Sequence, residues 1–230
     1  AVSWPEGGEF FPKEKTALSG QPIRKAILHG SPEGAYDFFK LSSNLPVIFV
    51  YCGSQGAEII NNAIIQILPD LLSRYQVVHQ TGEKLYNDVL GSSKLVLENS
   101  KNIERYKPMP YLNNLAVRMA SGIATIVIGR AGSSIFEIAS WGVPSIIIPI
   151  TNSNGDHQKK NAFSYARSGA CEVIEESNLT SHVLVSEIDK LIDSKERLAK
   201  MKEQALAFAS PDAASKIAGK AIEIALSHES

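Results

Sequence analysis

Apolar runs alternate with helix-like segments through most of the chain. Short runs rich in Val and Ile predict buried strands, and the residues between them repeat apolar side chains at helical spacing. Because the runs are apolar on both faces, the pattern favours an α/β fold with a parallel sheet and helices on both faces. The predicted strands are 46–52, 75–80, 94–99, 124–129, 144–150 and 171–175, and the predicted helices between them are 57–73, 82–90, 112–121 and 133–141.

The composition is that of a globular protein with a sizeable core. Hydrophobic residues make up 44% and charged residues 20% of the chain. The net charge of -1 argues against a nucleic-acid partner, because such binding depends on neutralising phosphates. No apolar run approaches the roughly 18 residues of a membrane span, and the N-terminus has no signal-peptide pattern. Cys52 and Cys171 stand outside any metal-ligand spacing, which predicts free thiols in a reducing compartment.

A first glycine-rich junction, Gly53-Ser54-Gln55-Gly56, separates a predicted strand from a predicted helix. Without side chains at the two glycines, backbone N–H groups could approach a phosphate at the positive end of the helix dipole. The Ser54 hydroxyl could donate there as well. A plain strand-to-helix turn explains the same residues, and short glycine patterns alone do not decide between the two interpretations.

A second junction runs from Gly129 to Ser134 and enters a helix that carries Glu137. Arg130 directly follows an apolar strand, where its charge requires an anion or a carboxylate as partner. Glu137 could complement the helix dipole or accept hydrogen bonds from the hydroxyl groups of a ligand.

A third junction, 151–158, is a loop of amide and hydroxyl side chains that opens another helix, with Asp156 as its predicted N-cap. This composition suits recognition of sugar hydroxyls, and it also suits a solvated loop. His157 is either a general base or a capping or solvent-facing residue.

All three junctions follow strands of one predicted sheet, where the ligands of doubly wound folds bind. Together they offer anion-binding backbone, a cation, a carboxylate and amides, which suits a nucleotide-diphosphate sugar. The chain has no G-x-G-x-x-G motif of a hydride-transfer domain and no lysine of a phosphate-binding P-loop after the first junction.

Four motifs together resemble the C-terminal half of the MurG family, the N-acetylglucosaminyltransferases that convert lipid I to lipid II. The motifs are SGQPIR (19–24), GSQGAEIIN (53–61), GRAGSSIFEIASWGVPSIIIP (129–149) and DHQKKNA (156–162). The family has the GT-B architecture, in which two Rossmann-like domains face each other and the second holds the sugar nucleotide. The resemblance implies no metal ion and no other cofactor, and the chain has no Asp-x-Asp pair.

The resemblance implies binding roles for the nucleotide moiety. Ser54 and Gln55 would meet the diphosphate, with Arg24 near the same cleft, and arginines such as Arg130 would stabilise the departing charge. The remaining nucleotide contacts would be the backbone of Leu112 to uracil, Ser133, Ser134 and Ile135 along the nucleotide, and Glu137 to the ribose hydroxyls.

For the hexose, the resemblance implies that Gln158, with His157 and Asn161, reads the N-acetylglucosamine hydroxyls. The Gly132–Glu137 spacing is one residue shorter than is usual in the family. The acceptor-side base would lie in the family's N-terminal domain, so no catalytic residue is assigned in this chain.

By the same resemblance, residues 1–22 are the end of a preceding domain plus a linker, and 23–210 form the UDP-sugar-binding domain. Residues 211–230 form a C-terminal helix that packs back on the preceding domain. The expected function is inverting transfer of N-acetylglucosamine from UDP-N-acetylglucosamine to a lipid-linked acceptor, at the inner face of the cell membrane with only peripheral contact. A subunit of a split transferase, a non-catalytic nucleotide-sugar binding module and a UDP-sugar 2-epimerase of the same architecture are the alternatives.

Overall fold

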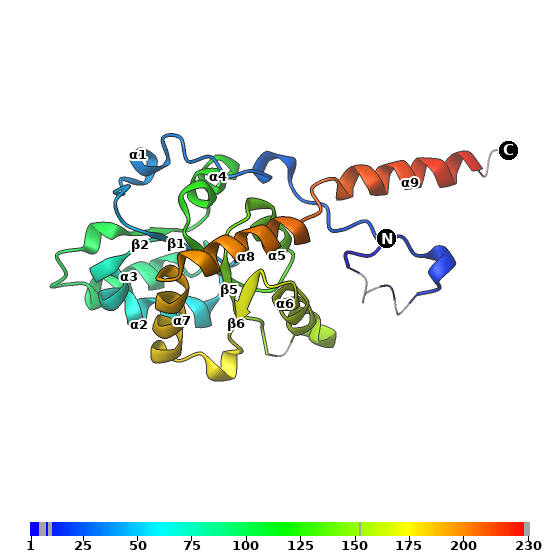
Figure 1. Ribbon diagram of the computed structural model, residues 1–230. Coiled ribbons are helices and arrows are strands. Elements are labelled where there is room, and N and C mark those ends of the chain that lie inside the picture. The colour runs from blue at the N-terminus through cyan, green and yellow to red at the C-terminus, as the bar shows by residue number, and fades with distance from the viewer. Residues whose placement is uncertain (5–7, 9–10, 152, 228–230) are drawn as a thin grey trace.

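A six-stranded parallel sheet forms the centre of the computed structural model, which describes residues 1–4, 8, 11–151 and 153–227 (Figure 1). The strand order is β3-β2-β1-β4-β5-β6, the doubly wound arrangement of Rossmann-like domains. The strands are β1 (Val47–Tyr51), β2 (Gln76–Gln80), β3 (Tyr106–Met109), β4 (Ile126–Gly129), β5 (Ser145–Ile147) and β6 (Cys171–Val173).

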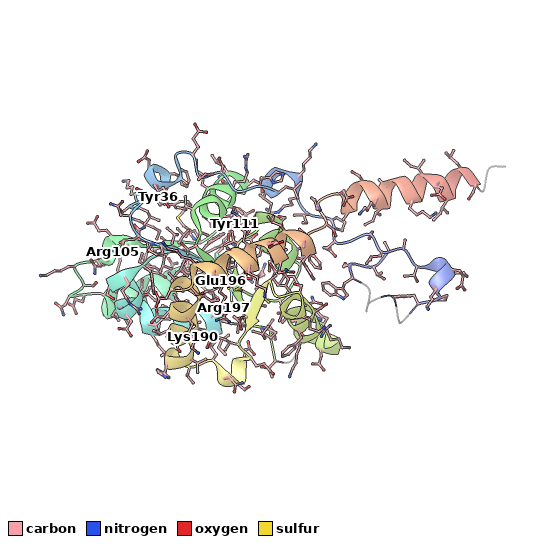
Figure 2. All side chains as sticks on the ribbon, viewed as in Figure 1. Tyr36, Arg105, Tyr111, Lys190, Glu196 and Arg197 are labelled. Atoms are coloured by element: carbon pink, nitrogen blue, oxygen red, sulfur yellow. The ribbon has the colours of Figure 1, made fainter. Side chains whose placement is uncertain are left out.

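Helices cover both faces of this sheet, which confirms the predicted fold class. One apolar core lies against α2 (Glu58–Arg74), α3 (Tyr86–Val96) and α7 (Ser181–Ile192). The other lies against α1 (Ala35–Phe39), α4 (Asn114–Ile123), α5 (Ser134–Trp141) and α6 (His157–Arg167). Helix α8 (Lys195–Phe208) contributes to both, since Met201 packs in the first core and Ala205 in the second. Lys190, Glu196 and Arg197 lie on α7 and α8 (Figure 2).

The strands supply side chains alternately to the two cores. Phe49 and Tyr51 of β1 pack on the α4–α5 side, whereas Ile48 and Val50 pack on the α2 side. Cys52 and Cys171 are buried and unpaired, as predicted from their spacing.

One predicted strand is wrong and one strand was missed. Residues 94–99 were expected as a strand, but they end α3 and begin the loop after it. Two of the three apolar residues there are exposed, Leu95 at 77% and Val96 at 43%, and only Leu97 is buried, so the segment is not the buried run that a central strand requires. The true strand β3 contains Lys107 and Pro108, which an edge strand tolerates and which hid it from the pattern.

The strand order places two predicted junctions side by side. The chain reverses its direction of winding between β1 and β4, and Tyr51 pairs with Gly129 at the carboxyl ends of these strands. The loop after β1 and the loop after β4 therefore meet at the switch point of the sheet, where open α/β folds bind ligands.

The N-terminal segment and the last helix lie side by side, beside the main body (Figure 1). The N–H of Val2 donates to Ala17, and the N–H of Ser19 donates back to Val2. Helix α9 (Ala213–Ser227) extends away from the sheet, and its apolar residues Ile222, Ile224 and Leu226 are exposed. Residues 5–7, 9 and 10 of the predicted linker lie outside the described residues. Within the described chain, no helix is both long and apolar enough to cross a membrane.

Candidate functional site

The loop after β1 is a tight turn with one closed side and one open side. Gly53 and Gly56 both have positive φ, at 76° and 70°. A Cβ atom on Gly56 would lie 1.9 Å from the carbonyl oxygen of Thr81, whereas a Cβ atom on Gly53 would meet nothing within 4 Å. The glycine at 56 is therefore required by packing against Thr81, while Gly53 faces open space with Ser54 and Gln55 exposed beside it.

Gln80 joins this loop to the segment that carries Leu112. The Gln80 side chain is buried; its Nε2 donates to the Gly53 carbonyl at 2.6 Å, and its Oε1 accepts from the Leu112 N–H at 3.1 Å. The backbone N–H of Leu112 is therefore engaged within the protein. Gln80 was not among the predicted site residues, although a polar residue at the end of an apolar strand was a signal in the sequence.

Glu137 lies at the centre of a hydrogen-bonded cluster at the switch point. Its side chain is 16% exposed. Arg24 Nε donates to Oε1 at 3.1 Å, and the Tyr51 hydroxyl donates to Oε2 at 2.7 Å. Arg24 also donates to Asn114 Oδ1 at 2.9 Å, so the segment before β1, β1 itself, α4 and α5 meet here. The structure thus brings the predicted residues Arg24 and Glu137 into direct contact, through partners that sequence analysis did not single out.

Arg130 has a carboxylate partner, one of the two kinds of partner that the sequence allowed. Its Nη1 donates to the Glu176 carboxylate and to the Ile148 carbonyl. Glu176, in the 3₁₀ turn Glu176–Asn178, also accepts from the Thr151 N–H at 2.9 Å and the Thr151 hydroxyl at 2.8 Å. Burial alone would raise the pKa of Glu176, but the bonds from Thr151 and Arg130 outweigh it and hold the pKa below its ordinary value. Glu176 gave no signal in the sequence.

The first residues of α5 directly follow the loop after β4 and bond to it. Ser133 is exposed at the N-cap position, and the Ser134 hydroxyl donates to the Arg130 carbonyl at 3.3 Å. A Cβ atom on Gly132 would meet nothing within 4 Å, so this turn is open as at Gly53. Asn161 Nδ2 donates to the Ala131 carbonyl at 2.9 Å and ties α6 to the same loop.

The third loop is anchored by Gln158. Its Oε1 accepts from the Ile150 N–H at 3.3 Å, and its own N–H donates to the Ser153 hydroxyl oxygen at 3.2 Å. Asp156 occupies the N-cap position with a φ of 54°, but its side chain makes no capping bond, so the predicted capping is wrong. The Ser153 hydroxyl bonds an N–H of the first turn instead. His157 begins α6 and is exposed, and Asn152 lies outside the described residues.

The site contains groups that suit an anionic, hydroxyl-bearing ligand. Open glycine turns, exposed Ser and Gln side chains and a nearly buried carboxylate surround the switch point. The described residues include no group of three or more His, Cys, Asp or Glu side chains placed to hold a metal ion.

These features define a Rossmann-like domain whose open loops lie at the carboxyl edge of a doubly wound sheet, where domains of this kind bind their ligands. The profile of the glycosyltransferase family 28 C-terminal domain matches residues 47–217. The chain belongs to this family.

A curated relative from Thermodesulfovibrio yellowstonii is 37% identical over 230 residues, which cover 98% of this chain and 59% of that protein. That relative is named UDP-N-acetylglucosamine--N-acetylmuramyl-(pentapeptide) pyrophosphoryl-undecaprenol N-acetylglucosamine transferase. The chain therefore spans about three fifths of the length of such a relative.

Solved structures show the same fold. Acinetobacter baumannii MurG matches with a TM-score of 0.67 and 25% identity, over 90% of this chain and 57% of that one. These findings confirm the resemblance to the C-terminal half of MurG. A putative UDP-N-acetylglucosamine 2-epimerase from Listeria monocytogenes matches with a TM-score of 0.54 and 17% identity, over 75% of this chain and 43% of that one, and shows the fold alone.

Proposed function

We propose that this chain is the donor-binding half of an inverting glycosyltransferase. The full-length enzyme would transfer N-acetylglucosamine from UDP-N-acetylglucosamine to a polyprenyl-diphosphate-linked muramoyl-pentapeptide in peptidoglycan synthesis. The observation that carries the proposal is the Glu137 carboxylate, held by Arg24 and Tyr51 at the switch point where the loops with the two open glycine turns meet. The names of the curated relatives support the choice of donor and acceptor.

The diphosphate would lie against the open turns. Ser54 and Gln55 are exposed beside Gly53, and Ser133 and Ser134 begin α5, whose N-terminus favours an anion. Arg130 would add positive charge near this edge while its guanidinium remains paired with Glu176. The departing UDP gains its negative charge in this region, so these groups would stabilise it more in the transition state than in the ground state.

The nucleoside would lie over Leu112 and Glu137. Because the Leu112 N–H already donates to Gln80, its carbonyl oxygen is the backbone group that we assign to the uracil N–H. Glu137 would accept hydrogen bonds from the ribose hydroxyls, while Arg24 holds the carboxylate in place. Ile135 is buried in the same helix and would support this wall.

The hexose would be read by the third loop. We assign Gln158, His157 and Asn161 to its hydroxyls, on the family resemblance of their motif. Gln158 and Asn161 also brace the loops through bonds to Ile150 and Ala131, so their amide groups are already oriented at this edge.

The reaction would proceed by attack of the acceptor hydroxyl on the anomeric carbon as UDP leaves. The acceptor, the general base and the peripheral membrane contact at the inner face would belong to a preceding domain, which the relatives' greater length allows. Helix α9 would pack back on that domain through its exposed apolar residues, such as Ile222 and Leu226. A groove of about 930 Å³ lies between α9 and residues 14–19, and Ile217 and Ile224 are among its lining residues.

The second candidate is a donor-binding subunit of a split transferase, or a binding module without activity of its own. A full-length transcript that encodes a preceding domain in frame would argue for the enzyme, and a separate transcript for the split form.

Titration of the chain with UDP tests the binding proposal. Glu137→Ala should weaken UDP by about 1–3 kcal/mol, the loss expected for a charged acceptor. Glu187→Ala, which removes a partly buried carboxylate paired with Lys190 on α7, is the control and should leave the affinity for UDP unchanged. Equal affinities for the parent and Glu137→Ala would show that the carboxylate serves the fold alone.

A further inference from the structure

The Glu137 carboxylate has one internal donor on each oxygen. Tyr51 donates to Oε2 at 2.7 Å and Arg24 donates to Oε1 at 3.1 Å. A carboxylate has about four lone-pair positions on its two oxygens, so each oxygen keeps about one position for a further donor. Two neighbouring hydroxyl groups, such as the 2′ and 3′ hydroxyls of a ribose, match that arrangement.

The proton of the Tyr51 hydroxyl points toward Glu137. Arg24 Nη2 donates to the Tyr51 oxygen at 3.0 Å, so the hydroxyl acts as an acceptor on that side and as a donor to Oε2 on the other. Burial, and then the neighbouring Glu137 carboxylate, raise the pKa of Tyr51 well above its ordinary value. The hydroxyl therefore stays protonated at neutral pH and keeps its role as donor.

The ring of Tyr51 is held by packing that does not involve its hydroxyl. Its centroid lies 5.3 Å from that of Phe49 and 5.3 Å from that of Trp141, and the residue is 3% exposed in β1. The ring contacts position the Tyr51 hydroxyl. The hydrogen bond from this hydroxyl to Oε2 in turn orients the Glu137 carboxylate. Tyr51→Phe thus removes one hydrogen bond and leaves the ring in place.

We propose that Tyr51 is a positioning residue that makes this site selective for ribose over 2′-deoxyribose. The proposal rests on the proposed function, in which Glu137 accepts from the ribose hydroxyls. With Tyr51 on Oε2 and Arg24 on Oε1, the carboxylate presents both oxygens to a pair of vicinal hydroxyls. A site built to pair with a hydroxyl rejects a ligand that lacks it, because the site's own polar group is left unpaired.

Titration of the 230-residue chain with UDP and with 2′-deoxy-UDP tests the proposal through the ratio of the two dissociation constants. The parent should prefer UDP, and Tyr51→Phe should reduce the preference by about threefold to tenfold. Melting curves establish that the variant is folded.

Tyr75→Phe is the matched control. The Tyr75 hydroxyl donates to Asp189 at 2.9 Å, and Arg74 pairs with the same carboxylate. A tyrosine, an arginine and a carboxylate therefore meet here too, on the other side of the sheet. This variant should leave the ratio of dissociation constants unchanged.

The outcomes separate this proposal from the proposed function. Loss of the preference in Tyr51→Phe with retention in Tyr75→Phe supports the positioning role. If Glu137→Ala loses the preference and Tyr51→Phe keeps it, or if Tyr51→Phe weakens both nucleotides by one factor, the positioning role is wrong and the binding proposal stands. A parent chain that binds neither nucleotide overturns both.

Discussion

The loop after β1 and the loop after β4 end neighbouring strands, but different forces hold them. Backbone packing and a neutral hydrogen bond hold the first, since Gly56 lies against Thr81 and the Gln80 side chain donates to the Gly53 carbonyl. Side-chain charge fixes the second, since Arg130 and Glu176 pair beneath it. In both loops the residues that hold the structure are distinct from the open positions, Gly53 and Gly132, that face the ligand edge.

This difference shows that the glycines of one motif can have different roles, some required by packing and others open to a ligand. The sequence suggested that Gly56 is bare so that a phosphate can approach, and the structure shows that Thr81 already occupies that space. It also suggested an anion or a carboxylate for Arg130, and the structure supplies the carboxylate. Two observations therefore separate residues that support the fold from residues open to a ligand. One is the space around a Cβ atom at each glycine, and the other is the partner of each charged side chain.

The largest expected effect comes from Gly56→Ala. The new Cβ would lie 1.9 Å from a backbone carbonyl that cannot move cheaply, and the φ of 70° is itself unfavourable for alanine. We expect a loss of more than about 3 kcal/mol in the free energy of unfolding, measured by urea denaturation.

Gly53→Ala is the matched control, because Gly53 has a similar φ of 76° and open space around it. It should cost only about 1–2 kcal/mol, the cost of the left-handed conformation. Equal losses for the two variants would show that conformation, and not contact with Thr81, explains the glycine at 56.

The second prediction concerns the charge pair of the other loop. Glu176→Gln leaves the nearly buried Arg130 without its counter-charge, and we expect a loss of about 2 kcal/mol at pH 7. Glu175→Gln, at an exposed pair with Lys159, should change stability by less than about 0.5 kcal/mol.

The stability of the parent should also depend on pH through Glu176. Because the folded pKa is lowered, the ionised carboxylate stabilises the protein above its unfolded pKa of about 4.3, and this contribution disappears as the pH falls through the folded pKa. Denaturation at pH 7 and at pH 3 should therefore show a smaller gap between the parent and Glu176→Gln at the lower pH. A constant gap would contradict the lowered pKa.

The third prediction concerns the exposed tip of the first loop. If Ser54 donates to the diphosphate, Ser54→Ala should weaken UDP about tenfold, the lower end for a bond to a charged group, and leave uridine unchanged. Ser92→Ala changes a serine on α3 and serves as the control. If titration shows that Ser54→Ala weakens the binding of UDP and of uridine equally, Ser54 does not contact the diphosphate.

The sequence predicted the sheet, its two covered faces and the edge where the loops meet, because strongly apolar runs and glycine junctions leave little choice. It did not predict β3, whose lysine and proline break the apolar pattern at an edge position. Nor did it predict Tyr51, Gln80, Asn114 or Glu176 as partners in the site. Their roles depend on contacts across 25 to 90 residues of chain, which no local pattern records. The assignments to ligand atoms remain predictions.

The smallest expected effect comes from Gln158→Ala in the third loop. Gln158 accepts the Ile150 N–H at 3.3 Å, so its loss should loosen the loop that we assign to the hexose without touching either glycine turn. A neutral hydrogen bond of this kind is worth about 1 kcal/mol, so UDP-N-acetylglucosamine should bind about fivefold more weakly relative to UDP. Gln66→Ala, on the outer side of α2, is the control for loss of an exposed amide and should leave both affinities unchanged. If UDP alone binds Gln158→Ala several-fold more weakly, the third loop supports the nucleotide pocket, and the division between loops that hold the nucleotide and a loop that reads the sugar is wrong.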